Sequence, residues 1–299
     1  GRPTYGRVSS NFLDAILLSN TEKGDQLMES VQLSRRFGKL DVSANYAHQD
    51  AKTVGEGQSS IAYSNWQFNQ LSKGDIFKQE LSTSSFQIEH RFNVSSTYNI
   101  VTGPVSHSFG LYYAAQSGQP YSLLIDGDPN KDGAFNNDLL YVPASGAMIL
   151  CPSNAGNPTA ASACGGRDPL DVAKFESFLS SVGLDPTSGS TPDRNSLKSP
   201  WNRRLDFHYE IGLPEYRGAR VLVQADVLNL FNMFDNESGV QRFVNFGTYR
   251  PIRYQGQDPT TGKAVYREAF SGALTPDRQY STANIASRWQ GRLGVRVNF

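Results

Sequence analysis

Six oxygen-bearing side chains in one short segment form the densest set of chemically competent groups in the chain: Asp126, Asp128, Asn130, Asp132, Asn136 and Asp138. Oxygen ligands at alternate positions followed by a glycine suit a hard cation such as calcium, because the backbone must curl around the ion. With Asp128 as the first position of such a loop, Gly133 is the sixth, but Leu139 stands at the twelfth, where an EF-hand has a bidentate acid. The segment therefore predicts a partial calcium site whose ion stiffens the loop, with a turn-rich acidic loop as the alternative.

The residue spacing gives little support for catalysis. The four histidines, His48, His90, His107 and His208, do not occur in HExxH spacing, and the chain has no GxSxG element. His208 lies between Asp206 and Glu210, where either a proton relay or a solvated histidine fits the pattern. We therefore predict that the chain is not an enzyme.

The only two cysteines, Cys151 and Cys164, lie close together in one segment. Neither belongs to a CxxC motif, and no histidine cluster accompanies them, so zinc and redox chemistry are disfavoured. The pair predicts a disulfide within one loop, which suits an oxidising compartment.

Composition narrows the class of protein further. The 28 Lys and Arg residues balance the 28 Asp and Glu residues, so no global field attracts nucleic acid, and we expect no nucleic-acid partner. The 17 Phe and 14 Tyr residues argue against intrinsic disorder, and the 27 Gly residues are typical of strands and turns. No stretch approaches the roughly 18 apolar residues of a spanning helix.

Seven runs of alternating apolar and polar residues predict β-strands. They cover residues 27–37, 40–47, 86–100, 109–115, 205–211, 221–231 and 289–299. Short connections, at Gly38-Lys39, Thr102-Gly103-Pro104 and Pro214 to Gly218, alternate with long segments near 54–84, 123–200 and 232–286. Tight turns at one end and long loops at the other are typical of an outer-membrane barrel. A soluble antiparallel sandwich is the alternative, disfavoured by the loop lengths and by charges on the polar face of nearly every run.

One helix is expected within the second long segment. Asp168-Pro169 is a helix start, Val172, Phe175, Leu179 and Val182 recur at helical spacing, and Gly183 is a stop. We expect this apolar stripe to pack against neighbouring loops.

Several short motifs occur in the order found in one family of membrane receptors. They are Asn20-Thr21-Glu22-Lys23-Gly24, Ser64-Asn65-Trp66, His90-Arg91-Phe92, Gln116-Ser117-Gly118-Gln119-Pro120-Tyr121-Ser122, Asn137-Asp138-Leu139-Leu140-Tyr141-Val142-Pro143, Arg194-Asn195, Pro200-Trp201, Leu205-Asp206 and Asp226-Val227-Leu228-Asn229-Leu230-Phe231-Asn232. The chain ends in Val295, Val297 and the aromatic Phe299. In these motifs and their order the chain resembles the C-terminal part of a TonB-dependent outer-membrane receptor, in its Oar-like branch.

The resemblance implies an all-β fold, an antiparallel transmembrane barrel of 22 strands with long extracellular loops. Seven runs would make only the C-terminal third of that barrel, so residues 1–299 are expected to be its C-terminal portion. No counterpart of the family's plug or N-terminal domains is visible in the sequence. Residues 1–25 are then expected to be the remains of an extracellular loop with a strand extension.

The resemblance also implies a function and a location. A receptor of this kind binds ligand with its extracellular loops and imports it through a plugged lumen in the outer membrane of a Gram-negative bacterium. The implied partners are the rest of the barrel and its plug, the TonB energy-coupling complex, the barrel-assembly machinery, and the lipid bilayer with its lipopolysaccharide. One alternative is a calcium-dependent surface binding or adhesion protein without transport, and another is an outer-membrane enzyme with its site in the loops.

Aromatic residues in and beside the long segments are the candidate ligand contacts: Trp66, Tyr121, Tyr141 and Trp201. Aromatic rings pack well against sugars and peptides. They also anchor strands at a membrane interface, which is the alternative role for Tyr121 and Trp201. The terminal Phe299 resembles the signal that the barrel-assembly machinery reads, and its alternative role is a lipid-facing residue.

Overall fold

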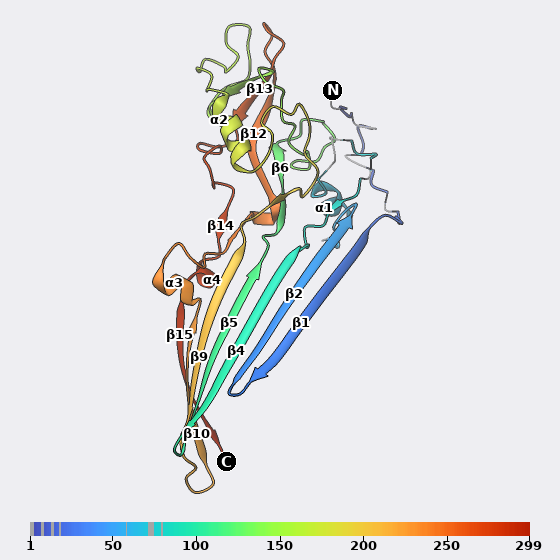
Figure 1. Ribbon diagram of the computed structural model, residues 1–299. Coiled ribbons are helices and arrows are strands. Elements are labelled where there is room, and N and C mark those ends of the chain that lie inside the picture. The colour runs from blue at the N-terminus through green and yellow to red at the C-terminus, as the bar shows by residue number, and fades with distance from the viewer. Residues whose placement is uncertain are drawn as a thin grey trace.

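The computed structural model describes residues 3–6, 9–12, 15–17, 19–57, 59–70, 75–78 and 80–299. Within these residues the molecule has two parts, a long twisted sheet and a head at one end of it (Figure 1). The short turns lie at the end of the sheet away from the head, and so does the C-terminus (Figure 1). Parts of residues 1–25 and of the segment 54–84 lie outside the described residues.

Seven long antiparallel strands form the main sheet: β1 (Asp25–Phe37), β2 (Leu40–Thr53), β4 (His90–Thr102), β5 (Val105–Gln116), β9 (Asn202–Gly212), β10 (Arg220–Leu228) and β15 (Gln290–Asn298). Their order in the sheet is their order in the chain, and the short β3 (Ser82–Thr83) extends one end of β2. The predicted all-β, antiparallel, up-and-down sheet is confirmed, with one strand for each predicted run.

Two predicted runs extend beyond their strands by more than one residue. Phe86 and Ile88 precede β4, because the chain turns there: the Gln87 N–H donates to the Ser84 carbonyl at 3.1 Å, and the Gln87 side chain accepts the Ala51 N–H at 2.8 Å. Phe231 lies beyond β10, because Asn229 adopts a left-handed conformation (φ 55°) that ends the strand before helix α3 (Leu230–Phe234).

Connections between the strands alternate in length as predicted. β1–β2 and β4–β5 are joined by two-residue turns in which Gly38 and Gly103 take positive φ. Residues 213–219 join β9 to β10 at the same end. The three long connections all leave from the other end and build the head.

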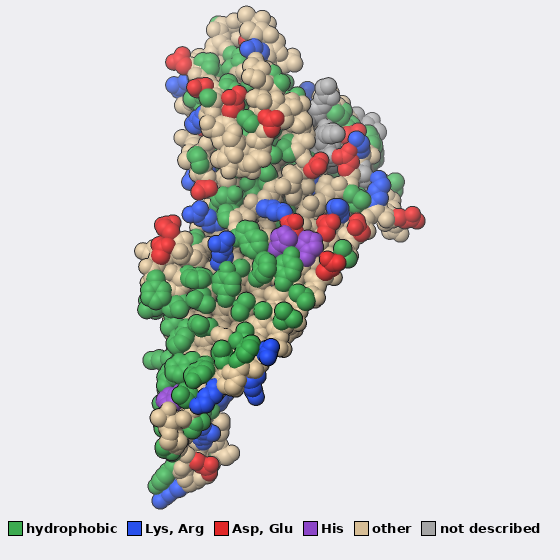
Figure 2. All heavy atoms as spheres, viewed as in Figure 1, with side chains coloured by type: hydrophobic (Ala, Val, Ile, Leu, Met, Phe, Trp, Pro, Cys, Tyr) green, Lys and Arg blue, Asp and Glu red, His purple; other side chains and the backbone are tan. Residues whose placement is uncertain are grey.

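The two faces of the main sheet differ in character. One face, which we call the apolar face, presents exposed apolar side chains from β1, β4, β5 and β15: Val31, Leu33, Phe37, Phe92, Val94, Tyr98, Phe109, Leu111, Leu293, Val295 and Val297. Figure 2 shows apolar side chains gathered over the sheet, whereas charged side chains gather on the head. This covering is far more extensive than the isolated apolar residues that any protein surface carries.

The opposite face is polar and is crossed by ion pairs between its strands. Arg36 on β1 donates to Asp41 on β2, with Nη2 3.0 Å from Oδ2. Arg296 on β15 pairs with Glu210 on β9, with Nη2 3.1 Å from Oε2. The alternation predicted from the sequence therefore sorts two kinds of side chain onto two faces.

Inside the head, a smaller mixed sheet has the order β7-β13-β12-β6-β8. Its strands are β6 (Pro120–Asp126), β7 (Met148–Cys151), β8 (Leu197–Lys198), β12 (Thr248–Gln257) and β13 (Ala264–Glu268). β12 pairs with β6 in parallel, and β13 pairs with β7 in parallel, so the second and third long segments fold together. The remaining elements are α1 (Ala62–Gln67), α2 (Ala173–Ser181), α4 (Asn284–Ser287), the 3₁₀ turn η2 (Asn245–Gly247) and the pair β11 (Arg242–Phe243) and β14 (Ser281–Thr282).

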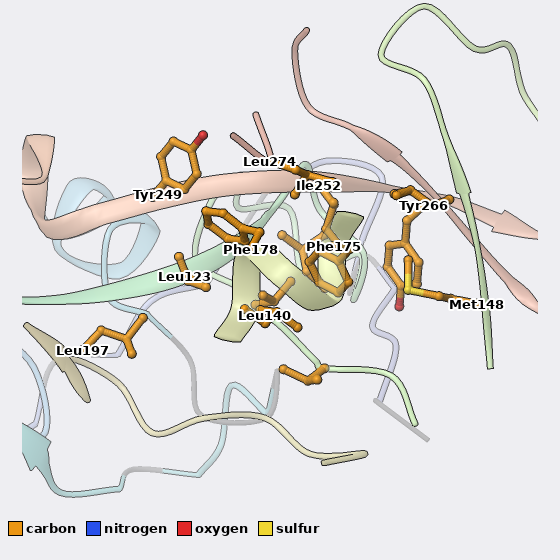
Figure 3. Packing of buried hydrophobic residues seen from close by; sticks show 14 of the residues in the cluster. Leu123, Leu140, Met148, Phe175, Phe178, Leu197, Tyr249, Ile252, Tyr266 and Leu274 are labelled. Carbon is orange, nitrogen blue, oxygen red and sulfur yellow. The ribbon is translucent and has the colours of Figure 1, made fainter. Parts of the chain in front are cut away.

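The main buried core lies in the head, where Phe175 and Phe178 of α2 pack against the sheet formed by β6 and β12 (Figure 3). The predicted apolar stripe does pack against neighbouring loops, although the helix begins at Ala173 rather than next to Pro169. Gly183 ends it as expected: with φ 84° it sets up a Schellman motif in which the Leu184 N–H donates to the Leu179 carbonyl at 3.0 Å. Among the described residues, no helix has both the length and the apolar character needed to cross a membrane.

Candidate functional site

An open pocket of about 410 Å³ lies in the head between the acidic segment and β12. Its walls come from two segments far apart in the chain and are formed by Asp126, Gly127, Asp128, Pro129, Lys131, Phe135, Asn136, Arg250, Arg253 and Tyr254. The parallel pairing of β6 with β12 places them together, since Asp126 and Arg253 are register partners at the ends of that ladder.

Asp126 is neutralised within the pocket wall. Arg253 Nε donates to Asp126 Oδ2 at 2.6 Å, and the guanidinium makes a second contact with the same carboxylate. The pair is well placed to fix the end of β6 against β12. The Asp126 carboxylate therefore pairs with an arginine and does not face a free position for a metal ion.

Asp128 closes the acidic turn on the loop's own backbone. Its Oδ1 accepts the N–H of Asp132 at 3.1 Å, and its Oδ2 accepts the N–H of Gly133 at 3.0 Å. Partial burial raises the pKa of the Asp128 carboxyl, and the charge of Asp132 adds to this, while the Gly133 N–H acts in the opposite direction.

Asp132 has both of its carboxylate oxygens engaged as well. Oδ1 accepts the Ala134 N–H at 2.8 Å, and Oδ2 accepts the side-chain amides of Asn130 and Asn137, each at 2.9 Å. The turn thus holds its curled shape through internal hydrogen bonds.

These contacts bear on the predicted calcium site. The structure brings Asp128, Asn130 and Asp132 into one turn, as the spacing requires, but their side-chain oxygens face N–H donors of the loop. Asp126 pairs with Arg253, and Asp138 is fully buried. In the described part of the chain, no group of three or more His, Cys, Asp and Glu side chains is arranged to hold a metal ion. Calcium binding therefore stays a prediction.

Positive charge and aromatic surface remain available in the pocket. Among the described residues, neither Lys131 nor Arg250 forms an ion pair with an acid. The rings of Tyr254 and Phe135 line the same space, and Phe135 is 57% exposed. This set suits a ligand that carries an acidic group next to an apolar or ring-shaped part.

The four predicted aromatic contacts do not come together in this pocket. Trp66 lies on α1, with its ring 5.9 Å from that of Tyr63. Tyr141 is 39% exposed on the head. Trp201 is 41% exposed just before β9, where its ring stacks on His90 with 6.1 Å between the centroids.

Tyr121 needs a correction. Only 1% of its surface is exposed, because it lies on β6 within the core of the head and meets the Tyr280 ring edge-on. Its ring contributes to the core and offers no surface to a ligand in this structure. The same burial raises the pKa of its hydroxyl.

The two remaining predicted sites are the cysteine pair and the terminal aromatic residue. Cys151 and Cys164 form a disulfide, as predicted, with 5.5 Å between their Cα atoms, and both are fully buried. Phe299 directly follows β15 and is fully exposed.

Sequence reasoning missed the pocket residues Arg250, Arg253 and Tyr254. They lie in the third long segment, which shows no motif, and only the parallel pairing of β12 with β6 brings them to the acidic turn. The one available signal was their clustering, since Arg250, Arg253 and Tyr254 stand within five positions of a strand-like stretch.

The comparisons with known proteins add no family assignment. No protein-family model and no curated protein matches the chain. The likeness to TonB-dependent receptors accordingly stays a prediction.

Proposed function

We propose that this chain is a sector of an outer-membrane β-barrel transporter of the TonB-dependent kind, whose head captures a ligand for import. The main sheet would be the membrane part and the head the extracellular part. The proposal extends the observed antiparallel sheet to a closed barrel of about 22 strands, as large plugged transporters have.

One observation carries the proposal, the exposed apolar face of the main sheet backed by a polar face with cross-strand ion pairs. In water an apolar face of this extent would be covered by another layer, as in a sandwich, but among the described residues no layer covers it. A barrel in lipid needs this arrangement, with apolar side chains outward and polar ones toward the lumen. The strand lengths, from 9 residues in β15 to 14 in β2, reach the roughly 9–11 residues that a tilted strand needs to span the bilayer.

The two edge strands of the sheet favour a closed barrel over a free-standing sheet. β1 and β15 stand at the two ends of the strand order, and among the described residues neither has a partner on its outer side. Open edges are not tolerated in lipid, so further strands must complete the circle. We assign them, with a plug, to the remainder of the same receptor.

The head suits ligand capture because all three long connections meet there. The second and third of these connections share a core, which makes the head a folded body with a pocket rather than a set of loose loops. Calcium at the acidic turn would stiffen one wall of that pocket. Import would need TonB, and insertion would need the barrel-assembly machinery reading Phe299.

The experiment isolates the native protein from outer-membrane and soluble fractions and maps its peptides. We expect the peptides of this chain in the outer membrane, together with peptides of further strands and of a plug in the same or a co-purifying polypeptide. In-cell cross-linking should then recover TonB with the complex. Recovery of the chain by itself in the soluble fraction would refute the proposal.

The same experiment separates transport from adhesion. A calcium-dependent adhesion protein would appear in the outer membrane but yield no TonB cross-link, and chelation of calcium would release whatever it holds.

A further inference from the structure

Two histidines face each other across neighbouring strands at the head end of the apolar face. His48 on β2 and His90 on β4 are direct register partners, and their ring centroids lie 5.1 Å apart with 31° between the ring planes. Figure 2 shows two adjacent histidine side chains at the border where apolar side chains give way to charged ones. Residues directly opposite each other on one face of an antiparallel pair are close enough for both side chains to reach one small ligand.

Hydrogen bonds fix the roles of the ring nitrogens of His48. Its Nδ1 lies 3.1 Å from the Glu89 carbonyl oxygen, which can only accept. The proton of the neutral ring must therefore be on Nδ1, and Nε2 carries the lone pair that a metal ion needs.

The surroundings of His90 allow the same tautomer. Its Nδ1 lies 2.9 Å from the Tyr46 hydroxyl, which can accept the Nδ1 proton. Its Nε2 is 3.7 Å from Glu89 Oε1, too far for a hydrogen bond. In metal-binding histidines, the ring nitrogen that does not bind the ion commonly donates its N–H to an oxygen of this kind. This hydrogen bond orients the ring.

Neighbouring rings hold the pair in position. Trp201 stacks on His90 with 7° between the planes, and Tyr46 stacks on it with 18°. The His90 side chain remains 35% exposed, so an ion can reach it from solvent.

We propose that His48 and His90 bind one divalent transition-metal ion through their two Nε2 atoms. Imidazole nitrogen suits copper, nickel and zinc, and copper(II) should bind most tightly of the three. In the described part of the chain no third His, Cys, Asp or Glu completes a metal-holding group, so water fills the other positions and the ion exchanges readily. Glu89 stands beside the pair but is engaged by Lys198. The site belongs to a single ladder of the sheet, so it stands whether or not the chain transports a ligand.

The test adds copper(II) chloride to the full-length protein in detergent and records its electron paramagnetic resonance spectrum. We expect one copper per chain with hyperfine structure from two nitrogens. His48→Gln and His90→Gln should each leave one nitrogen and weaken binding by about tenfold or more, since even groups behind a ligand cost that much. Tyr46→Phe, which removes only the hydroxyl that orients His90, should weaken binding by a similar factor with both nitrogens kept.

His107→Gln is the matched control, because His107 lies on the same face but its register partner is Ile211. It should leave the spectrum and affinity unchanged. Circular dichroism of each variant checks that the sheet is intact. The number of nitrogen ligands is measured on the wild-type protein and does not depend on the folding of any variant. A spectrum with one nitrogen or none, or the same copper binding after both histidines are replaced, would overturn the proposal.

Discussion

At the scale of single residues, buried hydrogen bonds stabilise the head, and the loss of one partner lowers the free energy of unfolding. Tyr249 is 9% exposed and donates its hydroxyl to the Ala273 carbonyl at 2.6 Å, which joins β12 to the segment that follows β13. Burial raises the pKa of Tyr249 to about 12, with the Arg278 charge acting against the shift and Glu268 adding to it. Removing the hydroxyl leaves a buried carbonyl without its donor, which typically costs about 1–3 kcal/mol.

Tyr249→Phe should therefore weaken the head and also change its response to alkali. The folded pKa lies above the unfolded value of about 10, so the contribution of Tyr249 is complete below pH 10 and disappears as the pH rises toward 12. Hydrogen exchange of the β12 amides at several pH values measures both effects. Tyr216→Phe, at a tyrosine that is 70% exposed in the β9–β10 connection, should leave exchange unchanged. If hydrogen exchange of the β12 amides had the same pH dependence in the wild-type protein and in Tyr249→Phe, Tyr249 would not have this stabilising role.

At the scale of elements, the sequence predicted the strands of the main sheet and missed the fold of the head. Alternation with period two is local, so each run of the sheet could be read from its own residues, as β9 with Leu205, Phe207 and Tyr209 shows. The head depends instead on pairings such as β6 with β12, between segments more than a hundred positions apart, and no local pattern encodes them. For the same reason Tyr121 was expected at a surface, whereas the core of the head buries it.

The junction between sheet and head offers an element-level prediction. Gly118 lies between β5 and β6, and a Cβ added there would stand 2.3 Å from the Ser199 carbonyl carbon and closer still to its oxygen. Gly118→Ala must therefore push apart the two chain segments that enter the head, and overpacking of this kind costs about 1–3 kcal/mol. Thermal unfolding of the full-length protein should show the loss, whereas Gly291→Ala on β15, where the nearest atom is 3.8 Å away, should not. An unchanged midpoint of thermal unfolding for Gly118→Ala would contradict the prediction, because it would mean that the two segments can move apart without loss of stability.

At the scale of the whole molecule, one end of the sheet carries short turns and the other carries a folded head, with an apolar face between them (Figures 1 and 2). The proposed membrane insertion would account for all three features at once: tight turns on one side, capture on the other, and lipid against the apolar face. The seven runs, the alternating connections, the disulfide and the helix were predictable from sequence. The pocket was not, because its arginines and its acidic turn come from different segments.

The most direct measurement is the environment of successive residues along β4, using spin labels attached at residues 92 to 97, one at a time, in the full-length protein in lipid. Even positions, which include Phe92 and Val94, lie on the apolar face, and odd positions, which include Asn93 and Ser95, lie on the polar face. The account predicts high accessibility to oxygen and low accessibility to a water-soluble nickel chelate at even positions, with the reverse at odd positions. Equal access of the chelate to both sets of positions would contradict a membrane-spanning sheet.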